Sequence, residues 1–444
     1  MSMDRSSLTT LAGRRATVWG LGRHGGGVGA ARFLARHGAE VTVTDLADVE
    51  ALADSIAQLS DVQIARFRLG GHDDADFHRA DLVVVNPAVR PDNRLLQVAR
   101  EAGAQLTSEI ELLLAHSPAR AIGVTGTVGK STTATMIFEI LRAAGMSVRL
   151  GGNIGGSLLD EVHALTPRDW LVLELSSFQL AHLSHQARWP RLAVITNCRP
   201  HHLDWHGGWA EYAAAKRRLI APGAAQACVL SPWDAEVDSW RNLTSCECLE
   251  PWPLDALPTL QLPGEHQRQN AALAAAAAQW AGAAAETISR VLAQFSGLPH
   301  RLQLVATIAG RRFYNDSKAT TPAATCAALA AVPEPVWLLL GGVDVGADLN
   351  EVIAAAADRA QGVATFGAAG PRLGELIARQ LPALPVRVTD TLADALTWCW
   401  SQSRAGDALL LSPACASLDQ YRDYAARGDE FMRCVGALAT LQRA

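Results

Sequence analysis

The sequence lacks an excess of basic residues, a long apolar run and a signal peptide. Its 444 residues carry 39 Lys and Arg against 44 Asp and Glu, for a net charge of −5, whereas a protein that binds nucleic acid over its whole surface is normally basic. The most suspicious apolar run, residues 271–278, is shorter than the roughly 20 residues that cross a bilayer. Residues 1–15 have no apolar stretch of the signal-peptide type. We therefore expect a cytoplasmic protein with no membrane span and no nucleic-acid partner.

A dense disulfide framework is also absent. The eight cysteines are scattered along a long chain, which is typical of reduced thiols. Cys246 and Cys248 form a lone C-x-C pair, so a tetrahedral zinc site, which needs four ligands, is not expected there. Hydrophobic residues make up 49% of the chain and charged residues 19%, which excludes a mostly disordered chain, a coiled coil and a collagen.

Short β-rich runs alternate with helical patterns along the whole chain, and this alternation predicts parallel strands joined by right-handed crossovers. Residues 269–285 predict one long Ala-rich helix, and the Pro-rich residues 251–262 predict a loop. At about 150 residues per domain, the length allows three domains. We predict an α/β fold with a Rossmann-like N-terminal domain, a central domain with a parallel sheet of the P-loop ATPase type, and a Rossmann-like C-terminal domain. The predicted domains are residues 1–116, 117–297 and 298–444.

The motif GTVGKS, residues 126–131, lies between a predicted strand and a predicted helix. Its glycines let successive N–H groups point at phosphate oxygens, and the helix N-terminus adds its positive end. Lys130 can bridge the outer phosphates, and the Ser131 hydroxyl is placed to bind Mg²⁺. The full G-x-x-x-x-G-K-[ST] pattern needs glycine at position 124, where this chain has valine. The motif indicates a nucleotide site, and the alternative is a tight turn with an incidental lysine.

A second glycine motif, GLGRHG at residues 20–25, also follows a predicted strand, and Asp45 ends the next one. This pattern is typical of a dinucleotide site in which the acidic residue binds a ribose hydroxyl. A lone G-x-G-x-x-G is weak evidence, however. A nicotinamide dinucleotide, another nucleotide such as a UDP-sugar, and a purely structural turn all remain open at this point.

Glu174 and a histidine-rich segment also follow apolar strands. A carboxylate at the end of a parallel strand beside the phosphate loop is where an NTPase holds its metal, although a solvated strand-end glutamate fits the same pattern. Residues 201–206 (HHLDWH) follow the strand at 192–197, and Lys216 comes one helix later. Three histidines and an aspartate could bind zinc, but their position in a phosphate-loop domain favours a magnesium and substrate-orienting role, above all for His202.

Several longer motifs occur in one order along nearly the whole chain. They are GVTGTVGKST (123–132), GGNIGG (151–156), LELSSFQL (173–180), the segment from HHLD to AAAK (201–216), LPHR (298–301), NDSKAT (315–320) and LSPACASLDQY (411–421). In these motifs the sequence resembles the Mur ligases of the MurD type. The resemblance implies a UDP-binding domain, a central ATPase domain and a C-terminal domain that carries the incoming amino acid.

The resemblance also implies a reaction. ATP, with Mg²⁺, phosphorylates the free carboxylate of UDP-N-acetylmuramoyl-L-alanine to an acyl phosphate, and the amine of D-glutamate then displaces phosphate. Phosphorylation supplies the leaving group that a carboxylate lacks, and domain closure would keep water away from the acyl phosphate. The implied partners are these substrates alone, bound by a monomer.

The site residues that the resemblance implies fall into four groups. ATP would be bound by Gly126, Thr127, Gly129, Lys130, Ser131, Thr132, Asn270, Arg301 and Asp316. The UDP substrate would be bound by Gly22, Arg23, Gly25, Asp45, Asn86, Asn153 and His202. The amino acid would be held by Lys318, Thr320, Ser417 and Tyr424. The metal positions would be Ser131, Glu174, His202 and Lys216, with Lys216 carbamylated, and the catalytic residues would be Lys130, Glu174, His202 and Lys216.

Three positions depart from the family pattern. Val128 stands where asparagine is usual, Tyr424 where phenylalanine is common, and Val345 where a lysine often pairs with a carboxylate of the incoming glutamate. Losing that charged contact would weaken binding by about 1.5–3 kcal/mol unless another cation compensates. Ligation of L-glutamate or another acidic amino acid therefore stays open. A nicotinamide-dependent oxidoreductase and a nucleotide sensor without turnover are the alternatives from other classes.

Overall fold

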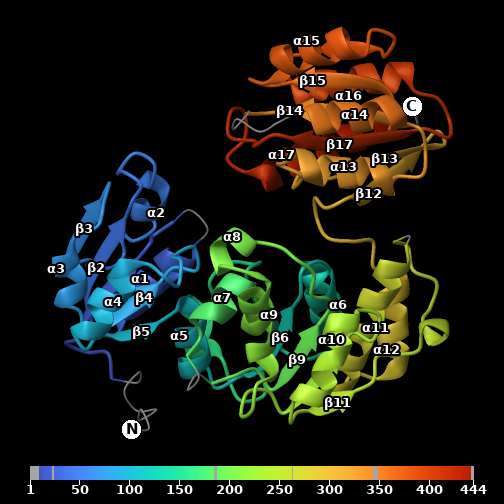
Figure 1. Ribbon diagram of the computed structural model, residues 1–444. Helices are drawn as coiled ribbons and strands as arrows, with labels where there is room; N and C mark the ends of the chain where they lie inside the picture. Colours follow the sequence, from blue (N-terminus) through green and yellow to red (C-terminus); the bar gives the residue numbers. More distant parts are fainter. Residues whose placement is uncertain (1–9, 23–24, 185–187, 263, 344–348, 442–444) are drawn as a thin grey trace. The chain divides into compact units, whose positions relative to one another are not determined.

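The structure, a computed structural model, contains three β-sheets flanked by helices (Figure 1). The chain divides into two compact units, Met1–Phe295 and Ser296–Ala444. The residues that the structure describes are 10–22, 25–184, 188–262, 264–343 and 349–441.

The first sheet is five-stranded, parallel throughout and built around β1. Its spatial order is β3 (Arg66–Leu69), β2 (Glu40–Asp45), β1 (Arg15–Trp19), β4 (Leu82–Val85) and β5 (Gln105–Thr107). The helices of this part are α1 (Gly26–Arg36), α2 (Ala53–Ala57), α3 (Asp74–His78), α4 (Arg94–Glu101) and α5 (Glu109–His116). The strand order reverses between β1 and β4, the switch point at which open α/β sheets bind ligands.

The second sheet is six-stranded, also parallel, and has β6 near its centre. Its order is β11 (Glu247–Leu249), β10 (Ala227–Leu230), β9 (Leu192–Ile195), β6 (Arg120–Thr125), β8 (Trp170–Glu174) and β7 (Val148–Gly152). The α-helices of this part are α6 (Lys130–Ala143), α7 (Ser177–His182), α8 (Leu203–His206), α9 (Trp209–Arg217), α10 (Ala235–Ser239), α11 (Glu265–Trp280) and α12 (Ala285–Gln294). Short 3₁₀ turns lie at η2 (Leu159–Ala164), η3 (Arg218–Ile220), η4 (Trp240–Leu243) and η5 (Leu254–Ala256).

The third sheet forms the second unit and is mixed. Its order is β12 (Gln303–Ile308), β13 (Arg311–Asn315), β17 (Ala408–Ala414), β14 (Val336–Gly341), β15 (Ala360–Phe366) and β16 (Val386–Val388). The helices are α13 (Pro322–Ala331), α14 (Asn350–Arg359), α15 (Gly370–Gln380), α16 (Leu392–Gln402) and α17 (Tyr424–Leu441). Strand β12 pairs antiparallel with β13, because the two-residue turn at Ala309 and Gly310 returns the chain directly.

The predicted α/β fold with three sheets is confirmed. The prediction of one helix over residues 269–285 was wrong in extent: the helix begins at Glu265 and ends at Trp280, and Gly282 then takes a positive φ of 107° before α12 starts. The expected loop at residues 251–262 contains the short 3₁₀ turn η5. The exact domain boundaries stay a prediction.

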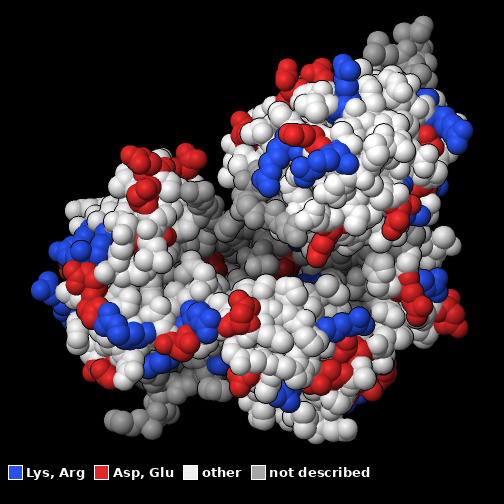
Figure 2. Space-filling view, turned by 45° about the horizontal axis from the view of Figure 1, so that its top comes forward, with Lys and Arg blue, Asp and Glu red and all other residues white. Residues whose placement is uncertain are grey.

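The central strands are buried because their sequences are continuously or almost continuously apolar. In β8 all five residues are buried, as are all four in β9, which is typical of parallel strands covered on both faces. No helix among the described residues is long and apolar enough to cross a membrane. On the face drawn in Figure 2, acidic and basic side chains are interspersed, in line with the small net charge of −5.

Candidate active site

The glycine motif after β6 forms a strand–loop–helix unit. Gly129 caps α6 in the left-handed conformation, with φ 84° and ψ −13°, and Gly126 has φ 154°. Both conformations are easily reached only by glycine. The first four N–H groups of an α-helix have no partner inside the helix. Here they are those of the first turn of α6, which begins at Lys130 directly after the loop. The unit is therefore a ready binding site for anionic oxygens.

The side chain of Asn197, directly beyond β9, holds this loop in shape. Its Oδ1 accepts hydrogen bonds from the N–H groups of Thr127 at 3.1 Å and Val128 at 2.9 Å, and its Nδ2 donates to the carbonyl of Val128. Asn270 of α11 lies against the end of the loop at Gly129. A Cβ added to Gly129 would come within 2.4 Å of Oδ1 of Asn270. Sequence reasoning missed Asn197, although it ends the predicted strand at 192–197.

Two lysines reach the loop from different elements. Lys130 Nζ donates to the carbonyl of Thr127 at 2.8 Å, and Lys216 Nζ, from α9, donates to the carbonyl of Gly126 at 2.6 Å. Lys216 is 1% exposed. Burial, together with the charge of Lys130, lowers the pKa of Lys216 to about 7. The pKa of the buried amine is therefore close to neutral pH.

Glu174 ends β8, the strand beside β6, where it is registered opposite Val124. The side chain is 1% exposed, and Asn153 Nδ2 donates to its Oε1 at 2.8 Å. Its Oε2 is buried without a hydrogen-bond partner. Burying an unpaired carboxylate oxygen is costly, so a cation at this position would complete the structure.

A cavity of about 180 Å³ opens beside the phosphate loop and the two lysines. It is lined by Gly126, Thr127, Lys130, Asn153, Ser176, Ser177, Phe178, His201, His202, Tyr212 and Lys216. His202 precedes α8 in a left-handed conformation, with φ 52°, and its ring lies 4.7 Å from that of Phe178. Burial lowers the pKa of His202, and the neighbouring His201 and lysines act in the same direction. The ring of His202 forms part of the cavity wall.

The residues present fit Mg²⁺ better than zinc. Among the described residues, no group of three or more His, Cys, Asp or Glu is arranged to hold a metal, whereas tetrahedral zinc needs such a set. Mg²⁺ keeps several waters and is bound through one or two carboxylates together with substrate phosphates. The unpartnered Oε2 of Glu174 beside the phosphate loop meets that requirement. Ser131, in the first turn of α6, is buried there as well.

The glycine motif after β1 has the same backbone form. Gly25 caps α1 with φ 85° and ψ −20°. Asp45, at the end of β2, accepts hydrogen bonds from the N–H groups of Gly22 at 3.0 Å and Ala47 at 2.9 Å. Asn86, after β4, donates to the carbonyl of Gly20. These residues meet at the switch point of the first sheet, while Arg23 lies outside the described residues.

Contacts inside the first unit join the loop after β4, which begins at Asn86, to the region of the cavity. Trp205 of α8 donates from its indole N–H to the carbonyl of Ala88 at 3.1 Å, and His182 Nε2 lies 2.8 Å from the carbonyl of Val89. Sequence reasoning assigned neither ring a role. Both contacts attach the loop that follows Asn86 to helices beside the cavity.

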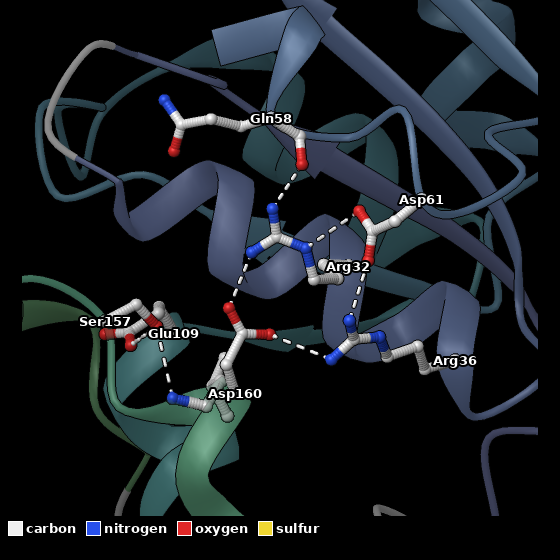
Figure 3. Close-up of polar contacts among 8 residues, drawn as sticks. Arg32, Arg36, Gln58, Asp61, Glu109, Ser157 and Asp160 are labelled. Carbon is white, nitrogen blue, oxygen red and sulfur yellow. Dashed lines mark hydrogen bonds and ion pairs between the residues drawn. The ribbon is translucent and has the colours of Figure 1, made fainter.

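Figure 3 shows a second attachment, between α1 and the 3₁₀ turn η2. The Arg32 guanidinium lies between Asp61, at 3.2 Å from Nε, and Asp160, at 2.6 Å from Nη1. Beside it, Ser157 donates from its hydroxyl to Glu109 at 2.6 Å. Ser157 belongs to the loop that also carries Asn153, and Glu109 begins α5, so this contact links α5 to the cavity wall.

In the second unit, the residues predicted for the amino acid follow two neighbouring strands. Lys318 and Thr320 come after β13, and Ser417 comes after β17, with which β13 is paired in parallel. Lys318 Nζ lies 5.0 Å from the ring centre of Tyr424, the first residue of α17. The structure thus brings Lys318 and Tyr424 together. Val345 lies outside the described residues.

Asp316 and Arg301 were predicted to bind nucleotide, and both lie in the second unit. Asp316 accepts hydrogen bonds from the N–H of Leu302 at 3.0 Å and the hydroxyl of Ser412 at 2.8 Å. Burial raises the pKa of Asp316 to about 6. Arg301 is exposed. Sequence reasoning missed Arg427 of α17, which is fully buried behind the same loops.

The fold and the site define a class: a multidomain α/β protein whose central sheet carries a phosphate loop with a lysine and an adjacent unpaired carboxylate. Family models match most of the chain in the same order. They are the Mur ligase MurD-like N-terminal domain at residues 14–108, the Mur ligase middle domain at 124–252 and the Mur ligase glutamate ligase domain at 300–415. The chain belongs to the Mur ligase family.

Relatives match over nearly the whole length. The chain is 36% identical to a UDP-N-acetylmuramoylalanine–D-glutamate ligase of Roseiflexus sp. (strain RS-1), with 96% of this chain and 99% of the relative covered. It is 38% identical to the protein of the same name in Geobacillus kaustophilus, with 96% and 98% covered. Among solved structures, UDP-N-acetylmuramate-alanine ligase MurC of Thermotoga maritima matches with a TM-score of 0.56 at 17% identity, covering 96% of this chain and 99% of that one. That likeness concerns the fold.

Proposed function

We propose that this chain adds D-glutamate to UDP-N-acetylmuramoyl-L-alanine with consumption of ATP, in peptidoglycan precursor synthesis. The observation that supports this function most is the buried Glu174 carboxylate, with one oxygen unpartnered, beside a loop that carries Lys130. An oxidoreductase would have no use for either group. The full-length relatives carry the name of the same ligation.

The phosphate loop performs the first half of the reaction. The N–H groups at the start of α6 and the ammonium of Lys130 stabilise negative charge on the outer phosphates of ATP. Glu174 and Ser131 would hold Mg²⁺, which would neutralise charge on the phosphate oxygens. Gly126, Thr127, Gly129 and Thr132 supply the rest of the loop, and Asn270 supports it from α11.

The substrates then exchange groups. The carboxylate of UDP-N-acetylmuramoyl-L-alanine attacks the terminal phosphorus of ATP, and ADP leaves with the bridging oxygen. The amine of D-glutamate attacks the acyl phosphate, forms the amide bond, loses a proton and displaces inorganic phosphate. Because the acyl phosphate reacts readily with water, the site must exclude water until the amine has attacked.

The remaining predicted residues bind the two other substrates and the distal part of ATP. The UDP moiety and the acid are bound by Gly22, Arg23, Gly25, Asp45, Asn86, Asn153 and His202. Glutamate is bound by Lys318, Thr320, Ser417 and Tyr424, and ATP is also bound by Arg301 and Asp316. We further propose that the chain acts as a monomer, which sedimentation equilibrium of the purified protein tests.

Lys216 is proposed to carry a carbamate and, with His202, to face a second metal position. The amine is 1% exposed, and its Nζ lies 2.6 Å from the carbonyl of Gly126. A carbamate would replace a buried cation near Lys130 with an anion, which removes a like-charge repulsion and supplies oxygens that a metal accepts. Crystal structures determined with and without bicarbonate would show the modification as added electron density on Lys216 Nζ.

Phosphate release tests the function. The assay contains ATP, Mg²⁺ and UDP-N-acetylmuramoyl-L-alanine, with D-glutamate, L-glutamate or no amino acid. Release that requires D-glutamate supports the proposal. A preference for L-glutamate or another acid retains ligation and moves the question of specificity to residues 341–348 and 417–424. No release with any acceptor contradicts the proposal and favours a sensor of nucleotides.

A further inference from the structure

The second unit contains a fully buried arginine outside every motif used above. Arg427 of α17 is 0% exposed. Its Nε donates to the hydroxyl of Ser317 at 3.0 Å, and its Nη2 donates to the carbonyl of the same residue at 2.9 Å. Its Nη1 donates to the carbonyls of Gly341 at 3.2 Å and Cys415 at 3.1 Å. One guanidinium therefore makes four hydrogen bonds.

The four acceptor oxygens belong to three residues, each at a different strand end. Ser317 follows β13, Gly341 ends β14 and Cys415 follows β17. These strands are consecutive in the sheet, in the order β13, β17, β14, and parallel to one another. Their carboxyl ends therefore lie at one edge, and Arg427 joins all three there.

The same three strand ends carry the residues proposed for the amino acid. Ser317 adjoins Lys318, and Cys415 is two residues from Ser417. The hydroxyl of Ser317 also donates to the carbonyl of Tyr424 at 2.8 Å. A displacement of the guanidinium would therefore disturb the backbone next to Lys318 and Ser417 and the hydrogen bond to Tyr424.

The charge of Arg427 is unusual for a purely structural contact. All four of its hydrogen-bond acceptors are neutral oxygens, and no ion pair of this side chain with a carboxylate occurs among the described residues. Burial lowers the pKa of Arg427 only to about 10, so it remains protonated at neutral pH. A buried cation is normally less stable than a well-packed apolar side chain. A positive charge behind a site for a dicarboxylic amino acid would attract the carboxylates of that substrate.

We propose that Arg427 is a positioning residue that assembles the site of the incoming amino acid from three strand ends and gives that site a positive potential. The inference rests on the proposed function, because it assigns these strand ends to glutamate. It predicts that loss of the guanidinium raises the KM for glutamate, while the KM values for ATP and the UDP substrate stay unchanged.

Two substitutions separate the hydrogen bonds from the charge. Arg427→Lys keeps the cation but lacks a fork that can reach three strand ends, and Arg427→Met removes both the charge and the donors. We expect the KM for D-glutamate to rise about fivefold in the lysine variant and at least 30-fold in the methionine variant. The KM values for the other two substrates should change less than twofold. If the methionine variant does not fold, the lysine variant alone carries the test.

Arg359 provides a matched control. This half-buried arginine at the end of α14 donates to the carbonyls of Leu329 and Val332, near the end of α13 and away from the strand ends that Arg427 joins. Arg359→Met should reduce stability without changing the KM for glutamate. A selective rise in the KM for glutamate in the Arg427 variants supports the proposal. An equal rise in Arg359→Met, or a loss of kcat in the Arg427 variants with all KM values unchanged, overturns it.

The wild-type assay separates this inference from the proposed function. If wild-type protein releases no phosphate with any amino acid, the proposed function fails before any variant is compared. If wild type turns over and Arg427→Lys has the wild-type KM for D-glutamate, only the role of Arg427 fails.

Discussion

Two regions of the first unit share a backbone form and differ in their chemistry. The loops after β1 and β6 both follow a central strand, and both end in a left-handed glycine that caps a helix. The conformations agree closely, with φ 85° and ψ −20° at Gly25 and φ 84° and ψ −13° at Gly129. Each loop therefore presents a helix N-terminus to an anion.

The side chains around the two loops differ in two respects. The helix after β6 begins with Lys130, whereas the helix after β1 begins with Gly26. The carboxylate beside the first loop, Asp45, accepts two backbone N–H groups, but Glu174 beside the second has a buried oxygen without a partner. Glycine geometry thus predicts that an anion binds, and only the lysine and the unpaired carboxylate distinguish phosphoryl transfer from simple binding.

The largest expected effect tests the lysine. Lys130→Ala should reduce kcat about 10³-fold, because the cation stabilises charge that develops on the transferred phosphoryl group. Binding of UDP-N-acetylmuramoyl-L-alanine, measured by calorimetry, should stay within twofold of wild type, since most of the residues proposed to bind it, among them Gly22, Gly25 and Asp45, belong to the region after β1 and β2 rather than to the phosphate loop. Turnover at the wild-type rate would contradict the assignment.

The carboxylates provide a matched pair. Glu174→Gln keeps the size of the side chain and removes the charge, and we expect a loss of about 10² in kcat and a higher Mg²⁺ requirement. Asp45→Asn retains an oxygen that can accept from Gly22 or Ala47, so we expect less than a tenfold weaker affinity for the UDP substrate and an unchanged Mg²⁺ requirement. Kinetics over a Mg²⁺ series measure both variants. Equal Mg²⁺ dependence in the two would contradict the distinction drawn between the loops.

Much of this comparison could be predicted from sequence because it depends on local features. Glycines before a helix, a lysine next to the cap and apolar strands all leave patterns within a few residues. Contacts between distant residues leave no such pattern. Trp205 meets Ala88 across 117 positions, and Arg427 meets Ser317 across 110. Both contacts depend on which strands become neighbours, which spacing along the chain does not encode.

The fold shows the same limit. Alternating strands and helices predict parallel sheets, but the antiparallel edge strand β12 was not predicted, because its apolar run is only three residues long and five of its six residues are exposed or half-buried. The sequence also could not predict that Oε2 of Glu174 lacks a hydrogen-bond partner. This depends on the position of Asn153, which donates to Oε1 only.

A smaller effect compares the two glycines directly. An alanine at either position must adopt a left-handed conformation, which costs about 1–2 kcal/mol. A Cβ at Gly25 meets nothing within 4 Å, whereas at Gly129 it would lie 2.4 Å from Asn270 Oδ1. Gly129→Ala should therefore weaken ATP binding by about 100-fold, and Gly25→Ala should weaken UDP-substrate binding by about tenfold. Adding Asn270→Ala to Gly129→Ala should relieve the clash and raise the thermal unfolding temperature above that of the single variant. An unchanged unfolding temperature would mean that the destabilisation comes from the strained backbone alone.

The smallest expected effect concerns the link between the two regions. Ser157 donates to Glu109, and a Cβ on Gly29 of α1 would come within 2.3 Å of its hydroxyl. Burial raises the pKa of Glu109 to about 7, from the ordinary value of about 4.5 for a glutamate. The folded protein therefore binds more protons than the unfolded chain between these values, and stability falls as pH rises from about 4.5 to about 7.

Glu109→Gln should remove that slope. The upper limit of the effect is about 3 kcal/mol, and solvent access to the half-buried side chain reduces our expectation to about 1 kcal/mol. Urea unfolding at several pH values measures it, with Glu161→Gln, an exposed carboxylate on η2, as the control. If the two loops belong to one cooperative unit, a single transition shifts in the variant. If they unfold separately, two transitions appear, and the link through Ser157 does not couple them.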